Sequence, residues 1–167
     1  SLAVIFFTTR TVHDDSIQTT KANLDMLNTA MFQSLRNAMT TGDPAAIAKA
    51  EEEAREINGV KRLIVAKSQP LIDMYSPGEQ MTDDKKILDS FKTKEEQLIE
   101  VYADDGHSLR MIKPMIAEQD CLMCHANQNV GDVIGIMDLT FSLDEADSQI
   151  QALTFYILTI STILGWL

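Results

Sequence analysis

The segment Ser108–Phe141 reads SLRMIKPMIAEQDCLMCHANQNVGDVIGIMDLTF and decides the fold. Its two ends, residues 108–116 and 133–141, are dense in branched and apolar side chains, as β-strands are. A third such run, Leu98–Tyr102, precedes them, and the turn Asp104-Asp105-Gly106 that follows it is typical of a hairpin. The segment therefore predicts an antiparallel sheet whose last two strands enclose a polar loop.

That loop, over residues 117–129, holds the run Cys121-Leu122-Met123-Cys124-His125, and with it both cysteines of the chain. This spacing is the attachment signature of a c-type haem. In such a site the two cysteines form thioethers to the haem vinyl groups, and the histidine supplies an axial nitrogen to the iron. The motif predicts one covalent haem c, held by Cys121, Cys124 and His125.

A Cys-x-x-Cys pair has other uses: a thiol redox centre, half of a zinc site, or a small disulfide loop. A zinc site needs two further ligands at short spacing, and the other histidines, His13 and His107, are not spaced in that way. A thioredoxin-like pair opens a helix after a buried strand, whereas the preceding residues 116–120 are too polar for that strand. The haem interpretation is favoured over these three.

Composition excludes several classes of function. The chain has 167 residues, a length that suits one domain with a real core. Its formal net charge is -11. Nucleic acid is not an expected partner, because binding it needs a basic stripe, and no polybasic patch for anionic lipid is present. Methionine is plentiful, at 9 residues, and in a haem protein it is both core filler and a candidate ligand.

Helical periodicity marks the N-terminal part of the chain. One apolar face runs along a predicted long helix over Val12–Thr41, formed by Leu24, Leu27, Met31, Leu35 and Met39. The other expected elements are a helix over Ala45–Ile57 with Asp43 as its N-cap, strands over Val60–Ala66 and Pro70–Tyr75, a helix over Asp83–Phe91, and an exit helix capped by Ser142-Leu143-Asp144-Glu145. The order predicts an α+β domain, in which Gly135 lets neighbouring backbone come close.

Both ends of the chain are apolar: residues 152–167 carry no charge, and Leu2–Phe7 carries none either. We expect residues 1–10 to end one transmembrane helix, 151–167 to start another, and 11–150 to form the domain between them, a full span needing about 20 residues. The alternatives are the tail of a signal peptide at the first end and a buried helix at the second. Few basic residues flank either segment, as on the translocated side of a bacterial inner membrane, so a periplasmic domain is expected.

Beyond the motif, several short segments resemble one protein family. They are Pro114-Met115-Ile116-Ala117, Val130-Gly131-Asp132-Val133-Ile134-Gly135, the helix end Ala38-Met39-Thr40-Thr41-Gly42-Asp43 and the strand Gly59–Val65. With the haem motif, they are similar to the periplasmic c-haem sensor domains of bacterial methyl-accepting chemotaxis proteins, which also occur on some histidine kinases and diguanylate cyclases. The resemblance implies a PAS-like antiparallel sheet with long N-terminal helices, and a homodimer that exchanges those helices.

The resemblance also implies that a methionine of the long helix is the second axial ligand in some members. Met39 matches that position, and Met31, two turns back on the same face, is the alternative. From the residues alone, Met39 is equally the last core residue of the apolar stripe. His107 is a weaker rival, because it lies beside a hairpin turn and is expected to face water. A water ligand or an open sixth position is a further option.

The haem propionates need cationic partners. Arg110 and Lys113 are the expected ones, with Lys61 and Arg62 on a strand that flanks the same pocket. Ordinary solvated surface charge is the other interpretation of these residues. The aromatic residues expected in the core are Tyr75, Phe91, Tyr102 and Phe141.

These features favour a sensor over an enzyme. Haem iron with a displaceable ligand detects redox state or a small gas such as NO, CO or O2, and the long helix would carry the signal towards the membrane. The rival class is a membrane-tethered c-type cytochrome for electron transfer, which uses the same haem. A peroxidase would need an open iron and a distal acid–base residue, for which His107 is the candidate.

The haem assignment makes a direct prediction. Protein produced with a competent haem-attachment machinery should be heavier than its polypeptide by the mass of one haem, because thioethers survive denaturation. Mass spectrometry of the denatured protein measures this difference. A mass equal to that of the bare chain would remove the basis of the assignment.

Overall fold

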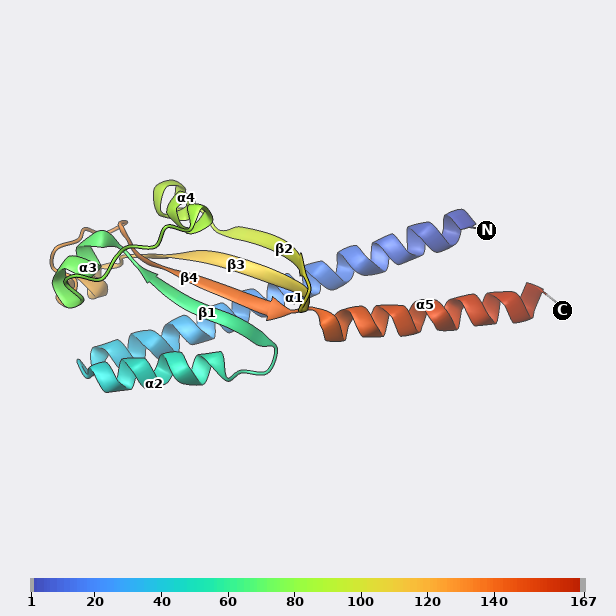
Figure 1. The fold of residues 1–167 in the computed structure, drawn as a ribbon, viewed down its shortest axis with the longest axis horizontal. Coiled ribbons are helices and arrows are strands. Elements are labelled where there is room, and N and C mark those ends of the chain that lie inside the picture. The colour runs from blue at the N-terminus through green and yellow to red at the C-terminus, as the bar shows by residue number, and fades with distance from the viewer. Residues whose placement is uncertain (1, 166–167) are drawn as a thin grey trace.

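A computed structural model describes residues 2–165, and Figure 1 shows its elements in sequence colours. The chain forms the elements α1 (Leu2–Thr40), α2 (Pro44–Arg55), β1 (Val60–Lys67), α3 (Gln69–Tyr75), α4 (Lys85–Thr93), β2 (Gln97–Ala103), β3 (Gly106–Ile116), the short 3-10 helix η1 (Gln119–Met123), β4 (Val133–Ser142) and α5 (Asp144–Gly165). The α+β class expected from the sequence is confirmed.

Strands in the described residues form one antiparallel sheet in the order β1-β4-β3-β2. The first and last strands are therefore neighbours, and β4 lies between β1 and β3. Gly135 on β4 pairs with Met115 on one side and with Lys67 on the other. A Cβ atom at Gly135 would lie 2.9 Å from the carbonyl oxygen of Ala66, so the close backbone approach predicted for this glycine is confirmed.

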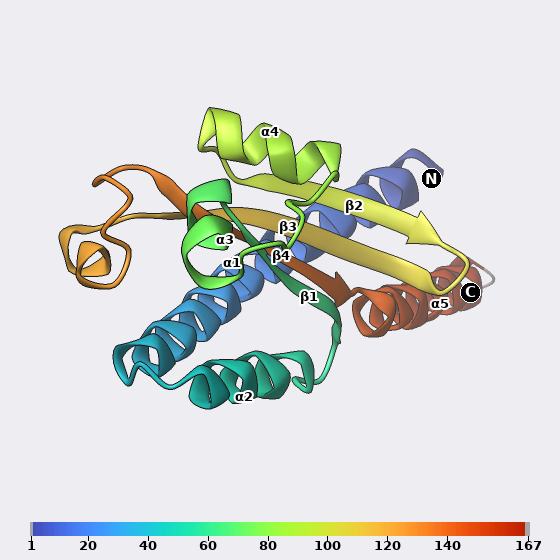
Figure 2. The same ribbon diagram turned by 60° about the vertical axis from the view of Figure 1, so that its left-hand side comes forward.

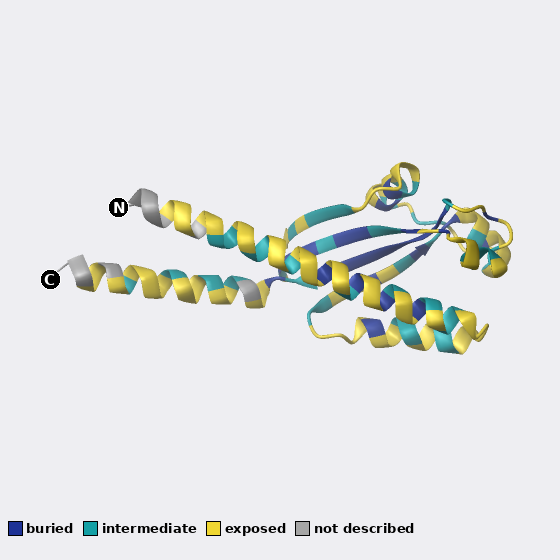
Figure 3. Ribbon diagram, turned by 180° about the vertical axis from the view of Figure 1, so that it is seen from behind, coloured by how far each residue is buried: buried dark blue, intermediate teal, exposed yellow. Residues whose placement is uncertain are grey.

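Helices cover both faces of the sheet, and each face has its own core (Figure 2). The α1 face holds the larger cluster, which includes Leu24, Met31, Ala54, Leu63, Leu109, Met111, Met115, Met137, Leu139 and Leu143. The α4 face holds a smaller cluster of Ala66, Ile87, Ile112, Val133 and Ile136. Figure 3, coloured by burial, shows α1 crossing the sheet with mostly exposed residues on the side that faces the viewer. Alternation along each strand divides the apolar residues between the two cores.

Helix α1 is one uninterrupted rod of 39 residues, about 58 Å long at the usual rise. It begins ten residues before the expected helix, so the apolar start of the chain continues directly into it. Leu24, Met31 and Leu35 are buried, as the predicted stripe requires. The start of α1 and the end of α5 lie at one end of the molecule, and α3 lies at the other (Figure 1).

Within residues 2–165, no helix is both long enough and apolar enough to cross a membrane. The sequence predicted only partial spans at the two ends, over residues 1–10 and 151–167. Residues 1, 166 and 167 of those segments lie outside the described residues.

The strand predicted over Pro70–Tyr75 is wrong, because these residues form the helix α3. Ser68 occupies the N-cap position, and Pro70 lies in the first turn, where a missing N–H removes no helical hydrogen bond. The apolar residues of this segment were too few to distinguish a strand period from a helical one.

The expectation that His107 faces water is also wrong, since it is only 7% exposed. Its Nδ1 lies 2.6 Å from a carboxylate oxygen of Asp147, and its ring stacks on that of Tyr102 with centroids 4.1 Å apart. The backbone N–H of His107 donates to Asp144 at 3.0 Å. Asp144 and Asp147 belong to the first turn of α5, so His107 fastens the β2–β3 hairpin to that helix.

Two of the four aromatic residues predicted in the core are on the surface. Tyr75 is 54% exposed and Tyr102 is 70% exposed, whereas Phe91 and Phe141 pack, partly buried, against the two core clusters. Each exposed tyrosine lies against a histidine ring, Tyr75 against His125 and Tyr102 against His107. A contact between a tyrosine and a distant histidine cannot be predicted from the sequence periodicity of the strand or helix that holds the tyrosine.

A buried ion-pair network lies on the α4 face of the sheet. Arg110 donates from Nε and Nη2 to the two oxygens of Asp138, both at 2.8 Å, and from Nη2 to Asp84 at 2.7 Å. The hydrogen bond to Asp138 raises the pKa of Arg110. Burial works to raise the pKa of Asp84, but hydrogen bonds from Arg110 and from the backbone N–H groups of Ile87 and Lys86 bring it below its usual value.

This network predicts an acid-sensitive contribution to stability. Because the folded pKa of Asp84 is lowered, its contribution is complete above the unfolded value of about 3.9 and is lost as pH falls through the folded value. Asp84→Asn keeps an N-cap for α4, since Asn caps as well as Asp, but removes the charge. The free energy of unfolding should then fall less steeply below about pH 4 than in the natural chain.

Urea unfolding followed by circular dichroism between pH 2 and 6 would measure these slopes, the pH range being set about the carboxylate values. Asp83→Asn is the control, because Asp83 is exposed and adjacent. Equal slopes in the two variants would contradict the role given to Asp84.

Candidate haem-binding site

The residues between β3 and β4, numbers 117–132, form a closed excursion beyond the end of the sheet, here called the motif loop. Its base is held by two backbone hydrogen bonds, from Ala117 to the Asp132 carbonyl at 2.8 Å and from Gly131 to the Ala117 carbonyl at 2.9 Å. Gly131 has a φ of 89°, which a residue with a side chain rarely adopts. The loop therefore leaves and rejoins the sheet at one point.

The haem-attachment motif occupies a tight turn at the tip of the motif loop. Cys121 lies in η1, and the N–H groups of Cys124 and His125 both donate to its carbonyl oxygen, at 3.2 and 2.9 Å. Both cysteines are free thiols, Cys121 half-buried and Cys124 exposed. The Sγ of Cys121 also accepts the N–H of Glu118 at 3.4 Å. The structure thus brings together the three residues that the sequence singled out.

The surroundings of His125 suit an iron ligand. The ring is half-buried, and burial lowers its pKa, which favours the neutral form that metals bind. Its Nδ1 is buried and has no hydrogen-bond partner among the residues that the structure describes. Two free thiols for the haem vinyl groups and a neutral imidazole for the iron lie on one turn, so the residues present fit a c-type haem.

Exposed apolar side chains occur in the motif and on the elements next to it. They lie on α3, on the motif loop and on the last residue of β3: Met74 at 40%, Tyr75 at 54%, Ile116 at 38%, Met123 at 85% and Val130 at 58% exposure. Exposed apolar surface of this kind marks a place where another apolar group binds and covers it. A porphyrin held on the motif loop is such a group.

Helix α3 supports the motif loop from one side. The hydroxyl of Tyr75 donates to the carbonyl oxygen of Cys124, and its ring meets that of His125 edge to face, with centroids 5.6 Å apart at 79°. Asn127 donates from Nδ2 to the Pro70 carbonyl at 2.7 Å. Sequence reasoning missed this support because it predicted a strand at α3, and no local pattern shows which later residues a helix will contact.

Helix α1 holds the motif loop from another side through Arg36. Its guanidinium lies 3.2 Å from Glu118 and 3.3 Å from Asp120, the two acidic residues just before Cys121. The carboxylates are 68% and 78% exposed, so these pairs contribute little to stability but set where the loop lies relative to α1. Sequence reasoning did not single out Arg36, because the paired residues are 82 and 84 positions apart.

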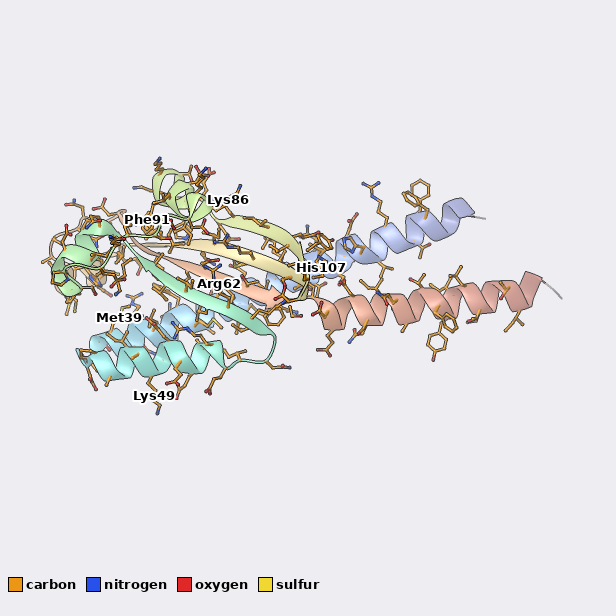
Figure 4. All side chains as sticks on the ribbon, in the orientation of Figure 1. Met39, Lys49, Arg62, Lys86, Phe91 and His107 are labelled. Atoms are coloured by element: carbon orange, nitrogen blue, oxygen red, sulfur yellow. The ribbon has the colours of Figure 1, made fainter. Side chains whose placement is uncertain are left out.

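The two methionines considered as ligands occupy different surroundings. Met39 is half-buried in the last turn of α1, at the same end of the molecule as α3 (Figure 4). Met31 is 5% exposed and belongs to the larger core with Leu109 and Met137. Arg36, one turn before Met39, contacts the motif loop, whereas the side chain of Met31 is packed within the core.

The cationic residues predicted beside the propionates all have carboxylate partners. Arg110 faces α4 and pairs with Asp138 and Asp84, whereas Lys113 faces α1 and pairs with Asp25 and, at 3.8 Å, with Glu96. The structure therefore does not bring Arg110 and Lys113 to one side of the sheet. The other two are engaged as well, Lys61 by Asp105 at 2.8 Å and Arg62 by Asp138 at 3.5 Å.

An antiparallel sheet between helices, with a haem-attachment motif on a loop beyond its end, defines a PAS-like haem-binding domain. A comparison with protein families matches residues 9–141 to the family described as Tll0287-like. The chain therefore belongs to the Tll0287-like family, which consists of c-type haem-binding, PAS-like sensor domains. A comparison with curated proteins gave no match.

Proposed function

We propose that this chain is the extracytoplasmic haem-based sensor domain of a transmembrane signal transducer of the chemoreceptor type, which detects redox state or a small gas at the iron. One observation carries the proposal: the motif loop is tied to the far end of α1 by Arg36, and it holds two free thiols and a His125 whose Nδ1 has no hydrogen-bond partner among the described residues. A domain that only carried electrons would need no tie between its haem and a helix that runs the length of the molecule.

The proposed cofactor is one covalent haem c, attached through Cys121 and Cys124 with His125 as an axial ligand. When bound, its iron supplies reversible one-electron chemistry and a coordination position for diatomic gases. The thioether of Met39 is the proposed second ligand. Met31 is the less suitable alternative, because moving its buried side chain would open a cavity in the core.

Helix α1 gives a signal a physical path. Met39 and Arg36 lie one turn apart near its end, and its middle is packed on the sheet through Leu24 and Met31. Binding or release of the Met39 thioether would therefore act on a continuous rod. Such coupling requires two arrangements of the helix whose free energies differ between bound and released Met39.

The cellular setting is part of the same proposal: a domain in the periplasm, attached to a bacterial inner membrane through both termini, and acting as a homodimer with exchanged N-terminal helices. Its support is that both chain ends leave at the end opposite α3 (Figure 1). In addition, α5 exposes many large apolar side chains, namely Leu153, Phe155, Tyr156, Ile157, Leu158, Ile160 and Ile163. We propose no enzymatic activity and no nucleic-acid partner.

A membrane-tethered c-type cytochrome for electron transfer is the second candidate. The exposure of Cys124 and of Met123, at 85%, favours it, because a haem edge that meets solvent can exchange electrons with a partner. Absorption spectra of the oxidised and reduced protein, alone and with NO and CO, distinguish the two. A sensor of gas binds at least one of them at the iron, and a sensor of redox state changes the coordination of its iron on reduction. An electron carrier does neither.

The methionine assignment predicts the outcome of a substitution. In the haem-loaded protein, Met39→Ala should raise the high-spin fraction of the iron and increase its affinity for CO, because the position opposite His125 is vacated. Absorption and electron paramagnetic resonance spectra measure both. Met26→Ala is the matched control, since Met26 lies on the same helix and is 67% exposed.

Met31→Ala tests the alternative ligand. It should lower the free energy of unfolding by about 2–5 kcal/mol, as for a buried methionine, and leave the spectra unchanged. Spectra of Met39→Ala that equal those of the unsubstituted protein would contradict the assignment of Met39 as the ligand. Altered spectra of Met31→Ala would contradict it as well.

The Arg36 tie predicts a loss of coupling. In the natural chain, amide hydrogen exchange of the last turn of α1 should differ between the oxidised and the reduced, CO-bound protein. Arg36→Gln should abolish that difference while changing stability by less than about 1 kcal/mol, because its partners are exposed. Lys49→Gln, which removes a surface pair within α2, is the control. An undiminished difference in Arg36→Gln would mean that the signal travels by another route.

A further inference from the structure

Tyr75, the last residue of α3, contacts the haem-attachment motif in two ways. Its hydroxyl donates to the backbone carbonyl of Cys124, and its ring edge meets the ring of His125. The side chain is nevertheless 54% exposed, so it is not held there by the core of the domain. In Figures 1 and 2, α3 lies at the end of the sheet from which the motif loop projects.

The orientation of the His125 ring is otherwise weakly determined. A metal-binding histidine usually donates its second ring N–H to a carbonyl or carboxylate, which fixes the ring. Here Nδ1 of His125 is buried and has no such partner among the described residues. What remains to orient the ring is its backbone and its packing, and Tyr75 acts on both, through the Cys124 carbonyl and through the ring contact.

The remainder of α3 makes this contact a stable one. Asn127 binds the carbonyl of Pro70 at 2.7 Å, and the buried Gln128 reaches the hydroxyl of Ser68 at 3.4 Å. Asn127 and Gln128 lie two and three residues after His125, and both partners lie at the start of α3. The helix is therefore attached to the motif loop at its two ends, with Tyr75 at the end that contacts His125.

We propose that Tyr75 is a positioning residue for the axial histidine: it fixes the ring of His125 towards the iron and keeps water from that ring, and so sets the reduction potential of the haem. The inference rests on the proposed function, since it requires a haem bound to His125. Water at the ring would stabilise the more highly charged oxidised iron, so removing Tyr75 should lower the potential.

The test compares Tyr75→Phe and Tyr75→Leu with Tyr102→Phe and Tyr102→Leu in the haem-loaded protein. Tyr102 is a matched control, because it is exposed, bonds a carboxylate and stacks on His107, which is fastened to α5. Spectroelectrochemical titration measures the potential, and resonance Raman spectroscopy of the reduced protein measures the iron–histidine stretch. Tyr75→Leu should lower the ratio of reduced to oxidised haem at a fixed potential about threefold. This corresponds to a reduction potential lower by about 28 mV, since a tenfold change in the ratio is about 59 mV. Tyr75→Phe, which loses only the hydroxyl, should shift it in the same direction by less.

Each outcome decides one question. If both Tyr75 variants keep the natural potential and stretching frequency, the inference is overturned while the haem assignment stands. If Tyr75→Leu loses its attached haem but keeps the natural circular dichroism, and Tyr102→Leu retains its haem, positioning of the motif by Tyr75 is supported at the stage of attachment. If the natural chain itself carries no covalent haem, the proposed function fails and this inference fails with it.

Discussion

The antiparallel pairing of Ile116 with Val133 is the constraint on which the site depends. Because β3 and β4 are hydrogen-bonded neighbours at that point, the residues between them must leave the sheet and return within one strand spacing. The motif therefore lies at the tip of a closed loop outside both cores, where its thiols are accessible. On the other side of β4, β1 packs closely at Gly135, where an added Cβ would lie 2.9 Å from the carbonyl oxygen of Ala66.

Side-chain contacts on two sides make this loop part of the domain. Arg36 ties its acidic side to α1, and Tyr75 ties its histidine side to α3. The two ties differ in kind, one being an exposed ion pair that salt screens and the other a hydrogen bond with an aromatic contact. At the opposite end, His107 fastens the hairpin to α5, so both long helices are joined to the sheet by side chains and not by packing alone.

Much of the fold was predictable because it depends on local sequence patterns. The strands over 108–116 and 133–141, the hairpin turn and the apolar stripe of α1 follow from period and turn chemistry, and Cys121, Cys124 and His125 follow from their spacing. The failures were one short segment and the contacts between distant residues. Pro70–Tyr75 was too short for its period to be decided, and the burial of His107 depends on carboxylates from a helix 37 to 40 positions later. Arg36 and Tyr75 act on the motif only after the chain has folded.

The position of the motif outside the cores has a consequence for the cell. None of Cys121, Cys124 and His125 belongs to either core cluster formed by the described residues, so both clusters are complete without the motif. A copy that missed haem attachment would still be compact, and proteases that remove unfolded chains would have no reason to discard it. The fraction of haem-loaded copies is then set by the supply of haem during biogenesis and not by protein quality control.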